Sequence, residues 1–147
     1  MFTQEEQSII DQAKAIVTGK LNTGEAFTDP SIVRDFLQLR LAGLEHEVFA
    51  VMFLNQRHLL IEYVELFRGT IDGASVYPRE VLKEALARNA AAVIFAHNHP
   101  SGVAEPSQAD MRITQKLKEA LALVDIRTLD HFVVGVDVIS FAERGLL

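Results

Sequence analysis

Cysteine does not occur anywhere in the 147-residue sequence. Disulfide bridges, cysteine nucleophiles and thiolate metal ligands are therefore excluded. The zinc deaminase signature, which needs a pair of cysteines, is excluded on the same ground. Any metal ion bound by this chain must be held by histidine, aspartate or glutamate side chains.

A surplus of positive charge is also lacking. The sequence has 14 lysine and arginine residues against 20 aspartate and glutamate residues, which gives a formal net charge of -6. Sequence-independent binding of nucleic acids usually relies on a basic surface. Direct binding of DNA is therefore disfavoured, although the arginines are spread along the chain and could gather into a local patch.

Long hydrophobic runs are missing as well. No apolar run reaches the roughly 20 residues that a membrane-spanning helix needs, and residues 1–6 lack the basic segment of a signal peptide. We therefore expect a cytoplasmic protein with no membrane partner. Apolar residues make up 49% of the sequence and charged residues 23%, which is the balance of a folded globular protein.

Four segments have the periodicity of amphipathic helices. We expect the first to follow a capping box at Thr3 and Glu6 and to end at Gly19. The others should begin at Asp29-Pro30, at Tyr77-Pro78 and at Ser107. The apolar residues expected on their buried sides include Ile9, Ile16, Val17, Val33, Phe36, Leu37, Leu41, Leu44, Val81, Leu82, Ala85, Leu86, Met111, Leu117 and Leu121.

Strands buried on both faces are predicted at residues 48–54 and 91–96, because each is a continuous apolar run too short for a typical helix. Residues 58–67 are predicted to form one or two further strands, and residues 126–136 and 139–141 to form the last strands. Helices that alternate with buried strands indicate an α/β fold with a mixed β-sheet flanked by helices.

His97 and His99 are separated by one residue, at the end of a predicted buried strand. In an extended segment alternate side chains point the same way, so both imidazoles can face one ion. Zinc accepts imidazole nitrogens and carboxylate oxygens, and a catalytic zinc site has three protein ligands with a fourth position open. The loop predicted from His97 to Pro106 contains Pro100, Gly102 and Pro106 and can turn the chain back, which makes Asp110 our candidate for the third ligand.

Both halves of this pattern also have a structural interpretation. Residues 107–110, Ser-Gln-Ala-Asp, match a capping box and can simply begin a helix. A His-x-His pair in a loop can be an ordinary hydrogen-bonding feature. The combination of the two, with turn residues between them, favours the metal site.

A hydrolytic metal site also needs a general acid/base, which is commonly a carboxylate. Glu47 precedes the first buried strand, where apolar surroundings would raise its pKa. Glu45, Glu62 and Glu65 are alternatives in segments that look more exposed. The HExxH zinc motif is excluded, because His46-Glu47 is not followed by a second histidine at the required position.

Taken together, residues 97–100 (HNHP), residues 107–110 (SQAD) and an upstream glutamate resemble the JAMM motif of JAB/MPN metalloproteases. Asn98 stands where many such proteins have serine or threonine, and asparagine is typical of the RadC branch. Further segments that resemble this branch are Gly69-Thr70, Pro78-Arg79-Glu80, residues 89–92, residues 97–102 and Asp130-His131. The resemblance covers about residues 30–147.

The resemblance implies a cytidine-deaminase-like α/β sandwich at residues 30–147, preceded by a helical extension at residues 1–29. It also implies a set of residue roles. His97, His99 and Asp110 would bind Zn²⁺, Glu47 would act as general acid/base, and Ser107 would stabilise the oxyanion of the tetrahedral intermediate.

Two residues near the C-terminus have an open role. Asp130 and His131 can hydrogen-bond toward a metal ligand, or they can close the final strand or pair with Arg127. His46 and His58 match no position of the motif and are expected to be ordinary polar residues.

The function expected from these features is that of a zinc-dependent peptidase or isopeptidase, with a peptide or protein as substrate. The alternative is a RadC-type binding module, non-catalytic or associated with DNA repair, that retains the metal site. A metal-dependent nuclease is disfavoured, because nucleases usually hold Mg²⁺ or two metal ions in carboxylate-rich sites.

Overall fold

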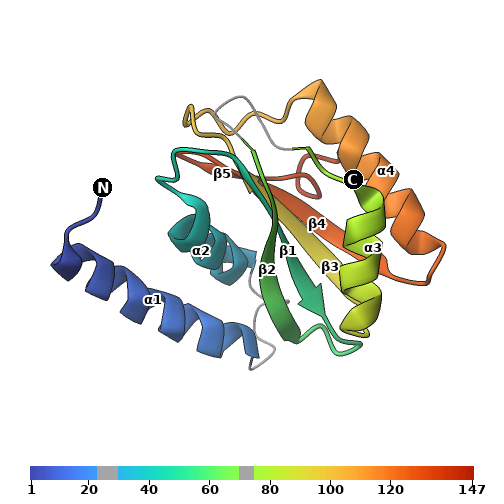
Figure 1. Cartoon of the computed structure of the whole chain (residues 1–147), viewed down its shortest axis with the longest axis horizontal. Coiled ribbons are helices and arrows are strands. Elements are labelled where there is room, and N and C mark those ends of the chain that lie inside the picture. Colours follow the sequence, from blue (N-terminus) through green and yellow to red (C-terminus); the bar gives the residue numbers. More distant parts are fainter. Residues whose placement is uncertain (23–29, 70–74) are drawn as a thin grey trace.

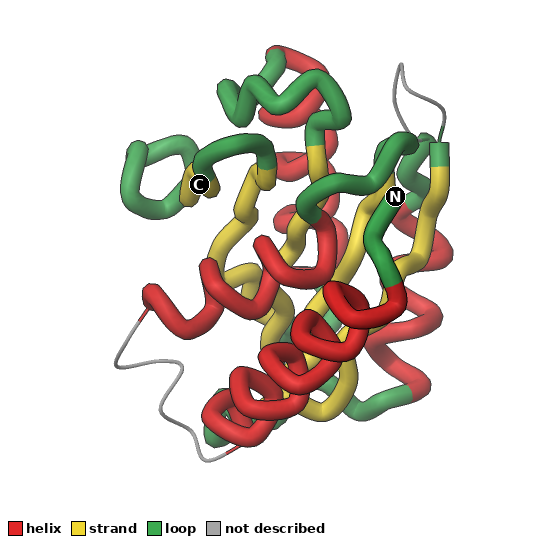
Figure 2. The backbone as a smooth tube through the Cα atoms, turned by 90° about the vertical axis from the view of Figure 1, so that its left-hand side faces the viewer, coloured by secondary structure: helices red, strands yellow, loops and turns green. Residues whose placement is uncertain are grey.

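The computed structural model describes residues 1–22, 30–69 and 75–147. Within them a five-stranded sheet has helices on both faces (Figures 1 and 2). The helices are α1 (Gln4–Asn22), α2 (Pro30–Leu41), α3 (Pro78–Ala87) and α4 (Gln108–Ala122). The strands are β1 (Val48–Leu54), β2 (Leu60–Arg68), β3 (Ala92–Asn98), β4 (Arg127–Val134) and β5 (Val138–Ser140).

The sheet has the strand order β2-β1-β3-β4-β5. β1 runs antiparallel to both β2 and β3, β3 and β4 are parallel, and β5 returns antiparallel to β4. The connection between the parallel strands contains α4, as a parallel pair requires a crossover. The predicted α/β fold with a mixed sheet flanked by helices is confirmed.

Side chains of the central strands alternate between two hydrophobic cores. Val48, Met52 and Leu54 of β1 belong to the core beneath α2, whereas Phe49 and Val51 belong to the core beneath α3 and α4. Because both faces are covered, every residue of β1 and of β3 is buried. This explains why neither strand shows alternating polarity in the sequence.

The outer helix α1 lies on α2 and away from the sheet (Figure 1). Our expectation that it ends at Gly19 is wrong, because the helix continues to Asn22. Glycine lowers helix stability by about 1 kcal/mol but does not end a helix by itself. Ile9 and Ile16, expected on the buried side, are 62% and 67% exposed.

Other boundaries differ from the expectation by a few residues. Residues 58–67, predicted to form one or two strands, give the single strand β2 with shifted bounds, and the last two strands are shorter or shifted. α2 ends at Leu41, so that Leu44 follows the helix while still packing against the first core. Leu86 is 54% exposed, because the buried line of α3 runs through Val81 and Ala85. The expected N-cap Asp29 lies outside the described residues.

β3 begins one residue later than predicted and ends two residues later, at Asn98. His97 is therefore part of the strand, and the loop begins at His99 rather than at His97. The strand continues because its partners continue: His97 and Asn98 are paired with Val133 and Val134 of β4. This fixes the backbone at the first of the two candidate histidines.

Candidate metal centre

The segment before β1, the loop after β3 and the first turn of α4 meet at the end of β3. Antiparallel pairing of β1 with β3 sets Phe49 opposite His97. Glu47, two residues before Phe49, shares its face of the sheet because strand side chains alternate. The sheet thus brings together a glutamate and a histidine that are 50 residues apart, and the Glu47 Oε1 and His97 Nε2 atoms lie 3.9 Å apart.

The loop after β3 and the first turn of α4 complete the cluster. The Nε2 atoms of His97 and His99 lie 3.0 Å apart. The carboxylate of Asp110 is 3.2 Å from His97 Nε2 through Oδ1 and 3.1 Å from His99 Nε2 through Oδ2. Glu47, His97, His99 and Asp110 each offer one ligand atom, and these four atoms lie within 4.8 Å of one another.

The separations of these atoms match those of a metal site. Two ligands bound about 2.0 to 2.1 Å from a tetrahedral zinc ion are about 3.3 Å apart. The three contacts among His97, His99 and Asp110 are 3.0 to 3.2 Å long. Two imidazoles and a carboxylate also form a donor set that zinc prefers. The residues present therefore fit a zinc ion.

The Nδ1 atoms of His97 and His99 are both within hydrogen-bond distance of other protein groups. His99 Nδ1 donates a hydrogen bond to the carbonyl of Val103 at 2.8 Å, and His97 Nδ1 lies 2.7 Å from His131 Nε2. The Nε2 atoms of His97 and His99 are left to converge on Asp110. Fixing the far nitrogen of a histidine is how proteins orient a metal-binding imidazole.

Ser107 and Asp110 form the capping box that the sequence also predicts. Ser107 Oγ accepts from the amide of Asp110 at 3.0 Å, and the amide of Ser107 donates to Asp110 Oδ2 at 2.9 Å. The capping interaction and the contact with the histidines are not alternatives, because one carboxylate makes both. The cap holds Asp110 in place, and Ser107 itself is exposed at the start of α4.

Burial and neighbouring charges shift the pKa values of the cluster. Burial raises the pKa of the partly buried Glu47, against the opposing effect of His97 and His99. Burial would also raise the pKa of Asp110, but its contacts with the two imidazoles hold that pKa well below its usual range. The Asp110 carboxylate raises the pKa of His99. Glu47 therefore holds a proton more readily than Asp110 does.

His131 and Thr114 lie behind His97 and were not among the candidate ligands. His131 is 0% exposed, and burial holds its pKa well below the usual value of a histidine. Its Nδ1 lies 2.6 Å from Thr114 Oγ1 of α4. For His131, the predicted contact with a candidate ligand is thus present. Thr114 was missed because it looks like any polar residue on a helix.

Asp130, in contrast, takes the other role that the sequence left open. Its carboxylate accepts hydrogen bonds from Ser140 Oγ at 2.6 Å and from the amide of Ala142 at 2.9 Å. It therefore closes the turn after β5 and does not face the cluster. The Arg127 guanidinium contacts His58 Nε2 at 2.8 Å.

Asn98, between the two histidines, connects β3 to the segment that carries Glu47. Its Oδ1 accepts from the amide of Val48 at 2.7 Å, and its Nδ2 donates to the carbonyl of His46 at 3.0 Å. The neighbours of Glu47 on both sides are therefore tied to the end of β3. Sequence reasoning recognised Asn98 only as a feature of the family and assigned it no contact.

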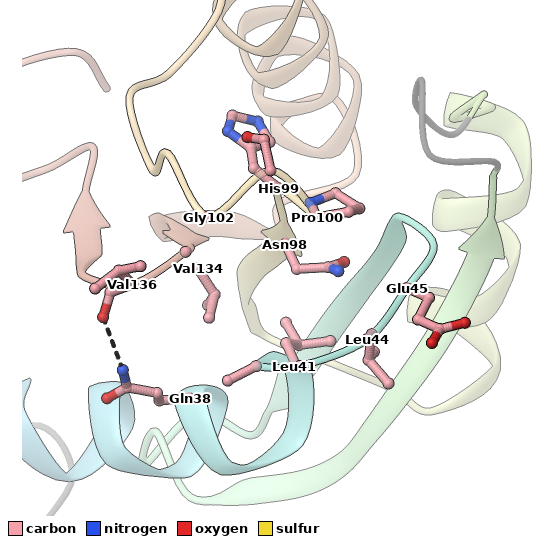
Figure 3. A pocket seen from close by; sticks show the side chains of 14 residues that line it. Gln38, Leu41, Leu44, Glu45, Asn98, His99, Pro100, Gly102, Val134 and Val136 are labelled. Carbon is pink, nitrogen blue, oxygen red and sulfur yellow. Dashed lines mark hydrogen bonds between the residues drawn. The ribbon is translucent and has the colours of Figure 1, made fainter. Parts of the chain in front are cut away.

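Two cavities adjoin this end of the sheet. A small one of about 210 Å³ is lined by Glu47, His97, Asp110 and His131, among others. A larger groove of about 790 Å³ lies between α2 and the loop after β3, with His99 at its rim and Leu41 and Leu44 across from it (Figure 3). The larger groove is not the metal cluster itself, but the two share the segment that bears the histidines.

Comparison with protein families gives a match to the RadC-like JAB domain over residues 27–146. The chain belongs to the RadC-like JAB domain family. The family predicted by resemblance is thus confirmed. The candidate metal cluster of this JAB domain lies entirely within the matched residues.

Relatives of this JAB domain occur in several bacteria and share the name UPF0758 protein. One from Vibrio cholerae serotype O1 is 62% identical over 142 residues, which cover 97% of this chain and 90% of the relative. One from Leptothrix cholodnii is 60% identical over 97% of this chain and 65% of its own length. One from Marinobacter nauticus is 60% identical over 96% of this chain and 63% of its own length. The chain thus spans about two thirds of the last two relatives.

A JAB domain with a cluster of one glutamate, two histidines and one aspartate fits a metal-dependent role. Among the helices in the described residues, none is long and apolar enough to cross a membrane.

Proposed function

We propose that this JAB domain is a zinc-dependent hydrolase that cleaves an amide bond in a peptide or protein, as a peptidase or an isopeptidase. The observation that carries the proposal is the mutual spacing of three side chains. His97 Nε2, His99 Nε2 and the Asp110 carboxylate lie 3.0 to 3.2 Å from one another. We assign these three residues as the zinc ligands.

Zinc in such a site would supply a Lewis acid that polarises a substrate carbonyl and makes water more acidic. The chain's own residues would do the rest. The Asp110 carboxylate, held by the capping box, stays ionised because its pKa is lowered. Glu47 has a raised pKa, which suits a group that accepts a proton from the attacking water and passes it to the leaving amine.

Ser107 is our candidate for stabilising the oxyanion of the tetrahedral intermediate. Its hydroxyl oxygen accepts from the amide of Asp110, which leaves the hydroxyl proton to be donated elsewhere. Hydrogen-bond donors that face a developing oxyanion are a common source of rate enhancement. The capping box would then orient the donor as well as the ligand.

The groove beside His99 supports a substrate with an apolar portion. Its walls include Leu41, Leu44, Val134 and Val136, together with backbone of the loop that carries His99. Such a groove can hold several residues of a substrate chain next to the reacting bond. The groove does not define which chain is cleaved.

Replacement of Glu47 by glutamine tests the reaction. Panels of peptides and isopeptide-linked substrates would be incubated with zinc-loaded wild type, Glu47→Gln and Glu119→Gln. We expect Glu47→Gln to retain zinc but to lose at least about 100-fold in kcat/KM, because general acid/base catalysis contributes 10²- to 10⁴-fold. Glu119, an exposed glutamate of α4 that lies outside the cluster and lines neither cavity, is the matched control, and Glu119→Gln should leave the rate near that of wild type.

The result that contradicts the proposal is equally specific. If zinc-loaded wild type cleaves no member of the panels faster than Glu47→Gln, the site is not hydrolytic. The chain would then act as a RadC-type binding module that retains its metal ion.

A further inference from the structure

A chain of buried hydrogen bonds runs from the back of His97 to α4. His97 Nδ1 lies 2.7 Å from His131 Nε2. His131 Nδ1 lies 2.6 Å from Thr114 Oγ1, and Thr114 Oγ1 donates to the backbone carbonyl of Asp110 at 2.7 Å. His131 is 0% exposed and Thr114 is 2% exposed.

Only the last of these bonds has a direction that chemistry fixes. A carbonyl oxygen can only accept, and a hydroxyl group has a single proton. The hydroxyl proton of Thr114 is therefore donated to the Asp110 carbonyl, and Thr114 Oγ1 must accept a hydrogen bond from His131 Nδ1–H. The donor and the acceptor of each hydrogen bond in this series follow from this one bond.

A neutral imidazole has one N–H donor and one acceptor nitrogen. Since His131 donates through Nδ1, its Nε2 is an acceptor, and the partner His97 Nδ1 must carry the proton. His97 is then the Nδ1–H tautomer, and its Nε2 presents a lone pair to His99 and Asp110. This is the tautomer that can bind a metal ion through Nε2.

We infer that Thr114 and His131 are positioning residues that hold His97 in the Nδ1–H tautomer, with the Nε2 lone pair directed at the metal ion. The inference rests on the proposed metal site and extends it by two residues, one from β4 and one from α4. The same threonine ties the backbone of Asp110, so that one hydroxyl connects two of the proposed ligands.

The surroundings of His131 leave it few other partners. Its ring stacks on Phe141, with ring centroids 4.6 Å apart, and meets the edges of Phe49 and Phe95 at 5.6 and 5.8 Å. Among the described residues, the side-chain hydrogen-bond partners of its two nitrogens are His97 and Thr114. Packing thus holds the ring in one orientation, and the hydroxyl decides its tautomer.

The opposite polarity would put a proton on His97 Nε2. Thr114 would then donate to His131 Nδ1 and could not donate to the Asp110 carbonyl. A metal ion would have to displace that proton before it could bind. The observed Thr114 bond selects against this arrangement before any metal is present.

A matched pair of variants at Thr114 tests the inference. Thr114→Val keeps the shape of the side chain and removes the hydroxyl, whereas Thr114→Ser keeps the hydroxyl. Metal-free wild type and both variants would be compared by the ¹⁵N chemical shifts of the histidine rings. Zinc affinity would be measured by competition with a chromophoric chelator.

We expect His97 in metal-free wild type and in Thr114→Ser to be the Nδ1–H tautomer, and in Thr114→Val to lose this preference. We expect zinc affinity about 10- to 100-fold weaker for Thr114→Val, the usual effect of removing a partner behind a ligand, and close to wild type for Thr114→Ser. His97 protonated on Nε2 in wild type, or equal zinc affinity of the valine and serine variants, would overturn the inference.

A second pair of variants, at His131, tests the inference independently in case a Thr114 variant does not fold. His131→Phe fits among the surrounding aromatic rings and removes the acceptor, whereas His131→Gln can still accept from His97 Nδ1–H and donate to Thr114. We expect weaker zinc binding for phenylalanine than for glutamine. Equal affinities of the two would contradict the role of His131.

The failure of this inference can be told apart from failure of the proposed function. The tautomer of His97 is read in the metal-free protein, so it tests the inference even if wild type binds no zinc. Conversely, zinc binding by wild type with an unaffected Thr114→Val leaves the metal site intact and removes only the roles of Thr114 and His131.

Discussion

Asn98 illustrates how a single side chain connects the two parts of the site. It is buried at the end of β3, and its amide group satisfies one acceptor and one donor on the segment around Glu47, namely the carbonyl of His46 and the amide of Val48. Serine or threonine has only one hydroxyl group and cannot make both bonds in the same way. The asparagine between the histidines therefore has a physical role here.

Replacement of Asn98 by alanine should destabilise the protein by about 1 to 3 kcal/mol, because it leaves the buried amide of Val48 and the partly buried carbonyl of His46 without this partner. The free energy of unfolding of the metal-free protein in urea would measure this. Gln115→Ala, at an exposed glutamine of α4, is the control and should change stability by less than about 0.5 kcal/mol. Equal stability of the two variants would show that the Asn98 bonds are not needed.

The pKa of His99 predicts how zinc binding depends on pH. Asp110 raises the pKa of His99 above 6.5 in the metal-free protein. Zinc and the proton compete for Nε2, so the apparent zinc affinity should fall as pH decreases, and the fall should begin above pH 6.5. Well below the raised pKa, each further pH unit should cost about tenfold in affinity for one displaced proton.

Affinity measured by chelator competition between pH 8 and pH 5 would check this dependence. An affinity that stays constant across the range would contradict ligation by His99. Zinc affinity should fall with decreasing pH for every histidine ligand. The fall should begin at a higher pH for His99, because its contact with Asp110 raises its pKa.

At the scale of elements, α1 and α2 contribute very differently. α2 packs directly on the sheet, and Leu37 is 0% exposed in the first core. α1 contacts α2 and leaves Ile9 and Ile16 exposed. The periodicity of α1 predicts a helix correctly, but not which of its apolar side chains are buried, because only the position of α2 decides that.

Matched truncations of the two helices should therefore differ. Leu37→Ala should cost about 2 to 5 kcal/mol through a cavity in the core, whereas Ile16→Ala should change stability by less than about 0.5 kcal/mol. Unfolding in urea would compare the two. A large loss for Ile16→Ala would mean that its side chain is covered in solution.

At the scale of the whole molecule, the sheet explains which parts of the site could be predicted. His97, His99 and Asp110 are close in sequence, and turn residues between them indicate that they meet. Glu47 lies 50 residues from His97 and was raised above Glu45, Glu62 and Glu65 only by family resemblance. Its place depends on the antiparallel register of β1 with β3, which sets Phe49 opposite His97.

Thr114 could not be found from the sequence in the same way, and for His131 the sequence left two roles open. Their contact joins α4 to β4, and His131 lies opposite Phe95 only because β3 and β4 are parallel in one register. Pairing between distant strands is decided by packing of the complete sheet, which a local pattern does not contain. The division into residues 1–29 and 30–147 stays a prediction, since the family match begins at residue 27.

The most direct test of the proposed metal centre is the metal content of the protein purified without chelators. Elemental analysis should find about one zinc ion per chain in wild type and in His46→Ala, whose side chain lies outside the cluster of four. His97→Ala should contain less than about a tenth as much, because one of three proposed ligands is lost. Wild type that contains no zinc and takes up none on addition, or His97→Ala that binds zinc as wild type does, would contradict the proposed metal centre.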